Sequence, residues 1–446
     1  MPLADTIAAI ATAPGRAGIG VVRVSGPAVC TIAAAILGRT LPPRVATLCD
    51  FLETESRILD RGIAIYYSAP HSYSGEDVLE LQGHGGLAVM QLVLRRCLDL
   101  GARPAQPGEF TQRAYLNDKL DLAQAESVAD LINASSEAAA RGAIRSLAGE
   151  FSGRVGQLNH ALTKLRTLVE ATLDFPEEGV DFLERTGVLE KLGHLRVGVT
   201  TLLAEAEQGR ILRDGAKVVL IGQPNVGKSS LLNRLAEEEV AIVTEIPGTT
   251  RDPLRYELVI EGIPVHVVDT AGLRVATDAI EKIGIERAWR EIDQADLALL
   301  IVDATMGIKE ADIEILLELP NNLKKIIVFN KIDLMKGAPA EIRARSRIEI
   351  SLSAKTGDGL DLLRTALLRC IGWQPTEEGI FSARERHIQA LRESEASLNR
   401  AANEPGSLEL MAEELRLAQQ SFGNITGKFS ADDLLGEIFS RFCIGK

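Results

Sequence analysis

The hydrophobic positions of the chain follow two different periods. From Met1 to about Asn117, β-like runs such as residues 21–24 and 78–81 alternate with glycine and proline breaks and with helical stretches. After Asp118 a stripe recurs at steps of three and four, the spacing that gathers side chains on one face of a helix. Its members are Leu158, Leu162, Leu165, Leu168, Val169 and Thr172. The pattern predicts a mixed α/β domain, then long helices that reach about Leu212 with a break near residues 175–176.

A second change of pattern occurs at Asp214 and Gly215. Residues 217–222 read as a buried strand, and strands alternate with helices from there to about Gly372. Helical patterning returns over residues 375–441, with a break at Pro405 and Gly406. An inserted domain needs only neighbouring ends and leaves the core of its host intact. We therefore predict an α/β domain over 1–117, a helical domain in two segments (118–213 and 373–446), and an inserted α/β domain over 214–372.

Composition and charge narrow the classes of function. The 446 residues carry a formal charge of −13, which argues against a surface coated with Lys and Arg that binds nucleic acid non-specifically. Any RNA contact is then local; a stripe of Arg141, Arg145 and Arg154 is one candidate, and an ordinary solvated face is the alternative. Five scattered cysteines without a Cys-x-x-Cys pair predict neither a disulfide framework nor a zinc site.

The sequence also predicts a cytoplasmic protein. The first twenty residues lack the basic start and apolar segment of a secretory signal. We see no run of about 18 apolar residues, the length that crosses a bilayer as a helix. We therefore expect no membrane partner.

A phosphate-binding loop follows the strand at residues 217–222. Residues 222–229 read Gly-Gln-Pro-Asn-Val-Gly-Lys-Ser and precede a helical stretch, so motif and context agree. The glycines allow backbone N–H groups to converge on phosphates at a helix N-terminus. Lys228 adds a positive charge at the β- and γ-phosphates, and the Ser229 hydroxyl can bind magnesium.

Three further segments occur in the order that a guanine-nucleotide domain requires. They are Asp-Thr-Ala-Gly at 269–272, Asn-Lys-Ile-Asp at 330–333 and Ser-Ala-Lys at 353–355. Asp269 ends an apolar strand and can hold magnesium through water, while the Gly272 N–H can reach the γ-phosphate. The Asp333 carboxylate matches the ring N–H and the exocyclic amine of guanine, and adenine would leave it unpaired. These motifs predict a site that selects GTP.

The motifs do not by themselves identify the residue that orients the attacking water. Leu273 stands where many GTPases carry the glutamine that orients the attacking water, so another group must do this. Glu281 is a candidate, with a solvated glutamate at a helix start as the alternative reading. In the loop over residues 244–252, Thr250 is our choice for the switch threonine that completes the magnesium shell.

That loop also suggests a source of positive charge. Pro247 and Gly248 permit a sharp backbone path, so its carbonyls, together with the Asn225 side chain, would suit a weakly hydrated monovalent cation. A cation there would neutralise charge that develops in the transition state, the task of an arginine finger elsewhere. Arg251 and Arg274 remain alternative sources of this charge.

The whole chain resembles the tRNA modification GTPase family MnmE, also called TrmE. The resemblance rests on Asn225 and the following Gly-Thr-Thr-Arg-Asp at 248–252, on the helix-flanked insertion, and on the terminal Phe-Cys-Ile-Gly-Lys at 442–446. It also rests on N-terminal segments over residues 18–26, 73–86 and 107–126. The GTPase motifs alone would be shared with ribosome-assembly GTPases.

The resemblance implies a fold, ligands and site residues. The implied fold is an N-terminal tetrahydrofolate-binding and dimerisation domain, a discontinuous helical bundle and an inserted Ras-like P-loop G domain. Magnesium would be held by Ser229 and Thr250, and potassium by Asn225, Thr244, Ile246 and Thr249, while Glu281 acts on the attacking water. The full set expected at GTP is Asn225, Val226, Gly227, Lys228, Ser229, Ser230, Thr244, Glu245, Ile246, Pro247, Gly248, Thr249, Thr250, Asp269, Thr270, Ala271, Gly272, Asn330, Lys331, Asp333, Ser353, Ala354 and Lys355.

The resemblance also implies a folate site. Arg23, Glu80, Lys119 and Lys446 match positions that hold 5-formyl- or 5,10-methylene-tetrahydrofolate in the family. Arg and Lys suit the carboxylates of the glutamate tail, and Glu80 suits the donor edge of the pterin. Cys443 lies near the family's proposed reaction centre and is either a catalytic nucleophile or a buried, inert thiol. His84 could titrate near neutrality, although loop packing is the better reading.

The activity implied by the resemblance is the addition of an aminomethyl or carboxymethylaminomethyl group to carbon 5 of the wobble uridine of certain tRNAs. It would require GTP, a one-carbon folate and a partner, MnmG (GidA), that carries the FAD. The chain would act as a homodimer within a heterotetramer or larger complex, and GTP hydrolysis would drive movement of the G domains. Two rivals remain: a GTP-dependent switch on ribosomal RNA, and a folate enzyme that GTP regulates.

Overall fold

The computed structural model describes residues 5–54, 57–174, 187–238, 255–269, 288–344, 347–374, 379–403, 407–427, 432–440 and 442–445. The chain divides into two compact units. The first comprises Met1–Ala129, Leu147–Arg196 and Glu393–Lys446, and the second comprises Asp130–Ser146 and Val197–Arg392. The domain boundaries expected from the sequence stay a prediction.

The first unit contains a six-stranded sheet that is mostly antiparallel. Its strand order is β3-β4-β5-β2-β1-β6, and only the β1–β6 pair is parallel. The strands are β1 (Ile7–Ile10), β2 (Gly20–Ser25), β3 (Thr47–Thr54), β4 (Arg57–Tyr67), β5 (Val78–Gly83) and β6 (Arg103–Pro104). Alternate residues such as Val22 and Val24 are buried against helices α1 (Val29–Leu37) and α2 (Leu87–Asp99), as the period-two pattern predicts.

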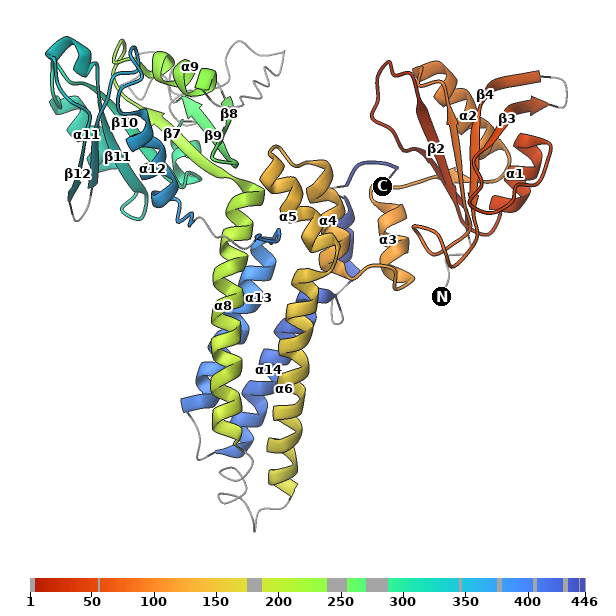
Figure 1. The fold of residues 1–446 in the computed structure, drawn as a ribbon. Helices are drawn as coiled ribbons and strands as arrows, with labels where there is room; N and C mark the ends of the chain where they lie inside the picture. The colour runs from red at the N-terminus through yellow and green to blue at the C-terminus, as the bar shows by residue number, and fades with distance from the viewer. Residues whose placement is uncertain are drawn as a thin grey trace. The chain divides into compact units, whose positions relative to one another are not determined.

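Helices complete this unit (Figure 1). They are α3 (Glu109–Leu116), α4 (Leu122–Ile132), α6 (Glu150–Asp174), α14 (Leu408–Thr426) and α15 (Asp432–Ser440). Helix α14 packs along α6, and the predicted stripe from Leu158 to Thr172 lies within α6. Leu162, Leu165, Val169 and Thr172 are buried. The predicted breaks at 175–176 and 405–406 fall outside the described residues.

The second unit contains a seven-stranded sheet in the order β12-β13-β11-β10-β7-β9-β8. Its five central strands are parallel, and the edge strands β8 and β12 are antiparallel. The strands are β7 (Ala216–Ile221), β8 (Arg255–Ile260), β9 (Ile263–Asp269), β10 (Leu297–Asp303), β11 (Lys324–Asn330), β12 (Ala340–Ala344) and β13 (Arg347–Ser351). The central strands are apolar on both sides because helices cover both faces.

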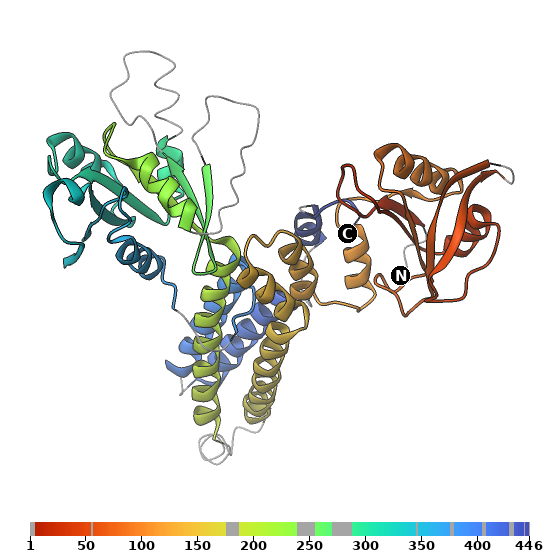
Figure 2. The same cartoon turned by 45° about the horizontal axis from the view of Figure 1, so that its top comes forward.

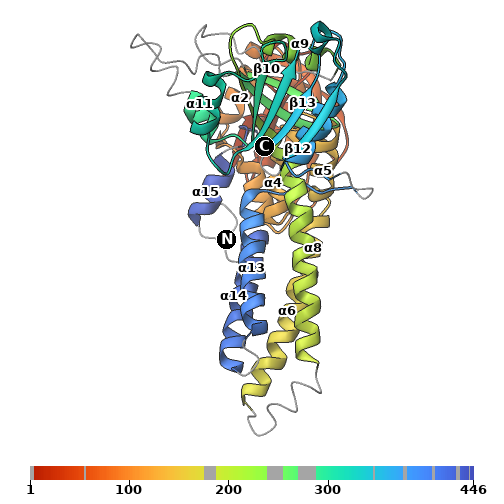
Figure 3. The ribbon, with the colours of Figure 1, turned by 90° about the vertical axis from the view of Figure 1, so that its left-hand side faces the viewer.

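The helices of this unit are α5 (Glu137–Leu147), α9 (Lys228–Glu238), α11 (Glu310–Glu318) and α12 (Leu360–Cys370), with a 3₁₀ turn over Ile332–Met335. Residues of α9 and α12 join the core on one face of the sheet, while α11 covers the other (Figure 3). Helix α8 (Val188–Asp214) leads directly into β7 (Figures 1 and 2). The chain returns from this α/β region into α13 (Glu385–Asn403).

The predicted fold class, an N-terminal α/β domain with helices and an inserted P-loop α/β region, is confirmed. Among the described residues, no helix combines the length and the apolar character that crossing a membrane requires.

Candidate nucleotide and folate sites

The phosphate-binding loop joins β7 to α9 at the carboxyl end of the parallel strands, where open α/β sheets bind ligands. Helix α9 begins at Lys228, so the loop's N–H groups precede a helix N-terminus. Gly227 has φ +99°, and a Cβ there would lie 2.2 Å from the Asn330 side-chain nitrogen. Only glycine fits at position 227, because both the backbone and the neighbouring amide exclude a side chain.

Asn330 joins the two halves of the nucleotide site. Its Nδ2 donates to the carbonyl of Val226 at 2.9 Å, and its Oδ1 accepts from the N–H of Ala354 at 2.9 Å. It therefore holds the phosphate loop against the predicted base-binding segment at 353–355. Because Asn330 is almost fully buried, these two hydrogen bonds satisfy a polar group that would otherwise destabilise the fold.

The predicted guanine-recognition carboxylate lies beside this bridge. The Ser353 hydroxyl donates to Asp333 Oδ1 at 2.7 Å, which fixes one oxygen of the carboxylate. The Lys331 ammonium donates to the Asn225 carbonyl at 2.7 Å and pairs with Asp303 at the same distance. The structure thus brings together Asn225, Val226, Asn330, Lys331, Asp333, Ser353 and Ala354 from three separate stretches of sequence.

Asp303 is a site residue that our sequence reasoning missed. It ends β10, next to the strand that ends at Asn330. Hydrogen bonds from Lys331 and Thr305 lower the pKa of Asp303 to about 2, so it is an anion at neutral pH. It orients Lys331. An acidic residue at the end of the strand before Asn-Lys-x-Asp is the signal that could have found it.

Asp269 has the surroundings of a cation ligand. It ends β9 with 9% of its surface exposed, and its Oδ1 has no hydrogen-bond partner among the described residues. Burial raises the pKa of this carboxyl, and the charge of Lys228 acts in the opposite direction. A buried carboxylate oxygen without a protein partner suits an outer-shell or direct role toward magnesium. Ser229, the other residue expected at magnesium, follows Lys228 in the first turn of α9.

Several predicted residues fall outside the described part of the chain. They are Thr244, Glu245, Ile246, Pro247, Gly248, Thr249 and Thr250 of the switch loop, Thr270, Ala271 and Gly272, together with Glu281 and Lys446. The alternative charge sources Arg251 and Arg274 lie outside it as well, as does Leu273. Of the residues expected to hold potassium, Asn225 is described: it is exposed and has φ +64°.

Arg23 and Glu80 of the predicted folate site form one unit across β2 and β5. Arg23 donates from Nε at 3.0 Å and from Nη2 at 2.8 Å, and both bonds end on Glu80 Oε1. The guanidinium also lies 5.5 Å from the ring centre of Tyr73 and 5.7 Å from that of Phe110. Both charged side chains are only 16% exposed. Arg23 and Glu80 are therefore paired and largely buried.

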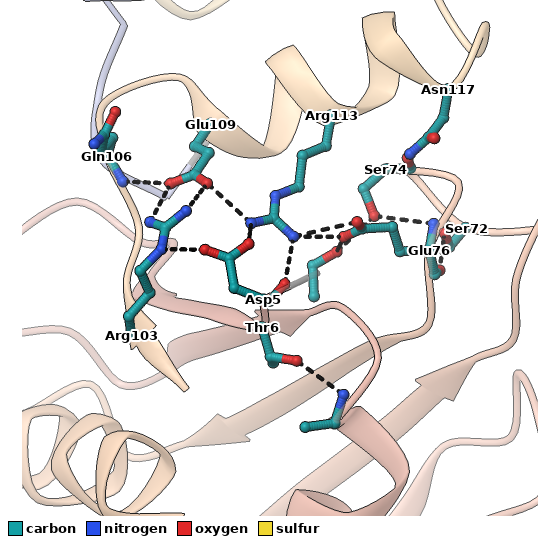
Figure 4. Close-up of polar contacts among 12 residues, drawn as sticks. Asp5, Thr6, Ser72, Ser74, Glu76, Arg103, Gln106, Glu109, Arg113 and Asn117 are labelled. Atoms are coloured by element: carbon teal, nitrogen blue, oxygen red, sulfur yellow. Dashed lines mark hydrogen bonds and ion pairs between the residues drawn. The ribbon is translucent and has the colours of Figure 1, made fainter. Parts of the chain in front are cut away.

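Helix α3 contributes neighbours of this pair and is itself held by an ionic network (Figure 4). Its Thr111 hydroxyl is 2.8 Å from the Tyr73 hydroxyl, and Phe110 lies on the same helix. The fully buried Arg113 pairs with Asp5, Glu76 and Glu109 at 2.9–3.0 Å. Burial alone would raise the pKa of Glu109, but hydrogen bonds from Arg103 and Arg113 hold it below its usual value. This ionic network fixes α3 against β1 and the loop that carries Tyr73.

The remaining predicted residues of this region lie nearby. Lys119 is exposed in the turn between α3 and α4, beside Gly75: a Cβ on Gly75 would lie 3.3 Å from the Lys119 Cε. Lys119 also lines a cavity of about 550 Å³ with Tyr115. The segment with Cys443 reaches the start of α3, since the N–H of Gly108 donates to the Cys443 carbonyl at 3.4 Å.

Three side chains singled out in the sequence, Cys443, His84 and Arg141, are exposed. The Cys443 thiol is exposed, which removes the alternative of a buried, inert cysteine. His84 is 73% exposed and pairs through Nδ1 with Asp60 at 2.7 Å, so it does not pack inside its loop. Arg141 forms an exposed ion pair with Glu137 on α5.

Known protein families and individual proteins match this chain over nearly its full length. Residues 6–119 match the family model "GTP-binding protein TrmE N-terminus", and residues 122–443 match "MnmE helical domain". Proteins named tRNA modification GTPase MnmE are similar throughout. The one from Dechloromonas aromatica is 56% identical over 99% of both chains, and that from Nitrosomonas europaea is 58% identical over 99% of both. The one from Thiobacillus denitrificans is 57% identical over 100% of this chain and 99% of its own. With these relatives and a site built from GTPase motifs, the chain belongs to the tRNA modification GTPase MnmE family.

Proposed function

We propose that this protein is a potassium-stimulated GTPase that modifies tRNA together with an FAD-containing partner of the MnmG (GidA) type. The product is an aminomethyl or carboxymethylaminomethyl group on carbon 5 of the wobble uridine of certain tRNAs, and a one-carbon tetrahydrofolate supplies the carbon. The family of the chain already shows that it is a tRNA modification GTPase. The observation that best supports the proposed GTP hydrolysis is the pair of hydrogen bonds by which Asn330 links the phosphate loop to Ala354.

The proposed nucleotide binding is supported by several of the described residues. Lys228, whose ammonium donates to the Gly222 carbonyl at 2.8 Å, would interact with the β- and γ-phosphates, and the N–H groups of the loop before α9 would donate to phosphate oxygens. Asp333 would accept two hydrogen bonds from guanine while Ser353 holds its carboxylate. Ser229 and Thr250 would hold Mg²⁺, and Asn225, Thr244, Ile246 and Thr249 would hold K⁺. When bound, these cations neutralise negative charge on the phosphate oxygens. Glu281 would orient the attacking water.

The Arg23–Glu80 pair refines the roles proposed at the folate. Both hydrogen bonds from Arg23 go to Glu80 Oε1, so Oε2 remains for the N–H donors of a pterin. Since Arg23 is already paired and lies beside two aromatic rings, we assign it to holding Glu80 rather than to the glutamate tail. Lys119 and Lys446 would then meet the tail carboxylates, and the exposed Cys443 would lie at the reacting carbon.

Replacing Glu80 by glutamine should weaken binding of 5-formyl-tetrahydrofolate about 10- to 100-fold and leave GTP affinity unchanged. Loss of one charge-assisted hydrogen bond costs about 1.5–3 kcal/mol, and Arg23 would lose its counter-ion. Calorimetric titration with both ligands measures this. Asp50→Asn is a matched control, because it removes the acid of another cross-strand pair, with Arg61, in the same sheet. Unchanged folate affinity in Glu80→Gln would remove Glu80 from the site.

The proposed assembly is a homodimer that joins the flavoprotein in a heterotetramer or larger complex, acts on tRNA in the cytoplasm, and itself holds GTP, Mg²⁺, K⁺ and the folate. The rival function, a switch on ribosomal RNA, makes a different prediction in cells. Nucleosides from total tRNA of a deletion strain should lack the modified wobble uridine. Unaltered wobble uridines, together with a ribosome-assembly defect, would favour the switch.

A further inference from the structure

The two chain segments that connect the inserted α/β region to the helices meet at one buried carboxylate. Asp130, near the end of α4, has a side chain that is 6% exposed. Its Oδ1 accepts from Arg213 Nε at 2.8 Å, on the last turn of α8. The same oxygen accepts from Arg384 Nη2 at 2.6 Å, directly before α13. Oδ2 accepts from the Ser382 hydroxyl at 3.2 Å.

The segment before α13, which carries Phe381 and Ser382 and returns the chain from the α/β region, is held closely against two helices. The N–H of Ser382 donates to the carbonyl of Gly142 at 3.1 Å, and the Ser146 hydroxyl donates to the Ser382 carbonyl at 2.8 Å. A Cβ at Gly209 of α8 would lie 2.2 Å from the carbonyl of Phe381. The exit from the α/β region is therefore a packed, hydrogen-bonded segment, which transmits displacement better than a flexible linker.

Asp214 and Gly215, which lead from α8 into the α/β region, contact β9, the strand that ends at the nucleotide site. Gly215 has φ +69°, and a Cβ there would lie 2.4 Å from the carbonyl of Pro264 in β9. His266 of the same strand hydrogen-bonds the Asp214 carbonyl at 3.2 Å. The other end of β9 is Asp269, the buried carboxylate of the nucleotide site. A single strand thus connects Asp269 to the residues adjacent to Arg213.

We propose that Asp130 is a positioning residue that couples the nucleotide state of the GTPase to the helices. Displacement of β9 and β7 during GTP hydrolysis passes through Arg213 and Arg384 to Asp130 and so to α4. The same helix packs through Leu122 and Ala125 against Phe439 and Phe442, next to Cys443. The inference rests on the proposed function, because it assigns to GTP hydrolysis a mechanical path toward the tRNA-modifying chemistry.

Asp130→Asn tests this coupling in the complete reaction with the flavoprotein, folate and tRNA. We expect tRNA modification to fall about tenfold or more while GTP hydrolysis stays within about twofold, since coupling between sites spans about 5- to 150-fold. Asp130→Glu, which keeps the charge, should recover much of the modification. Glu207→Gln is the control, because it removes the α8–α13 ion pair with Arg392 and leaves both connecting segments intact. Wild-type modification in Asp130→Asn, or a parallel loss of hydrolysis and modification, would overturn the proposal.

A second readout does not depend on tRNA chemistry. Hydrogen exchange of α4 should differ between the GDP state and the GDP–aluminium fluoride state in the wild type, and this difference should vanish in Asp130→Asn. If the wild type fails to modify tRNA but α4 responds to nucleotide in this way, the proposed function fails and the coupling stands. If Asp130→Asn does not fold, Ser382→Ala removes the longest of the described hydrogen bonds to Asp130 and should show a smaller loss of modification in the same assays. Identical α4 exchange in both nucleotide states of the wild type would refute the coupling.

Discussion

Asp333→Asn should exchange the nucleotide preference of this protein from GTP to xanthosine triphosphate. In the proposed site the carboxylate would accept two hydrogen bonds from guanine, each worth about 1.5–3 kcal/mol when one partner is charged. Their loss corresponds to a GTP affinity at least about 100-fold weaker. Asparagine presents an amide N–H that matches the additional carbonyl of xanthine, and the Ser353 hydroxyl, which donates to Asp333 in the wild type, can still donate to the one oxygen of the amide. Titration of both nucleotides measures the change.

The control for this exchange is Asp358→Asn. Asp358 lies in the adjoining loop and accepts from the Thr356 hydroxyl at 2.7 Å, so its loss alters the same region without removing the base-recognition carboxylate. It should bind GTP as the wild type does. GTP affinity that survives in Asp333→Asn, with no gain for xanthosine triphosphate, would show that guanine is recognised elsewhere.

Potassium should accelerate GTP hydrolysis about 100-fold over sodium at equal ionic strength. The proposed cation supplies positive charge in the transition state, and removal of one such preorganised group costs about 10²–10³ in kcat. Rubidium, close to potassium in size, should substitute for it. The effect should appear in kcat rather than in GDP affinity, because the charge on the phosphates grows only as the bond breaks. Single-turnover rates in each salt measure it.

Asn225→Gly is the variant suited to this test. Asn225 has φ +64°, a conformation that glycine adopts freely and alanine does not, so glycine removes the side-chain oxygen without straining the loop. Its carbonyl can still accept from Lys331. Hydrolysis in potassium should fall toward the sodium rate. Equal rates in both salts for the wild type, together with a large loss in Arg251→Ala or Arg274→Ala, would assign the charge to an arginine instead.

The nucleotide site was predictable because each of its motifs is local. A strand, a glycine-rich turn and a helix follow one another at 216–238, and short segments at the ends of later parallel strands must meet at the same edge of the sheet. The Asn330 contacts with Val226 and Ala354 are the expected result of that topology. Asp303 was not predicted as a site residue because its role depends on Lys331, a partner 28 residues away in the sequence.

The proposed folate site was less predictable, because its geometry depends on pairings between residues far apart in the sequence. Arg23 and Glu80 are 57 residues apart, and only the register of β2 against β5 places them opposite each other. Arg113 reaches Asp5 across 108 residues, and periodicity along the chain carries no signal of that contact. The resemblance to the MnmE family therefore implied Arg23 and Glu80 as candidates, but the sequence could not show that the two side chains pair with each other.

The most direct test of the proposed activity is mass spectrometry of tRNA incubated with this protein, the flavoprotein partner, GTP and a one-carbon folate. The account predicts an added aminomethyl or carboxymethylaminomethyl mass at the wobble uridine that disappears when this chain, its partner or GTP is left out. The same product formed without this chain, or unmodified uridine in the complete reaction, would contradict it.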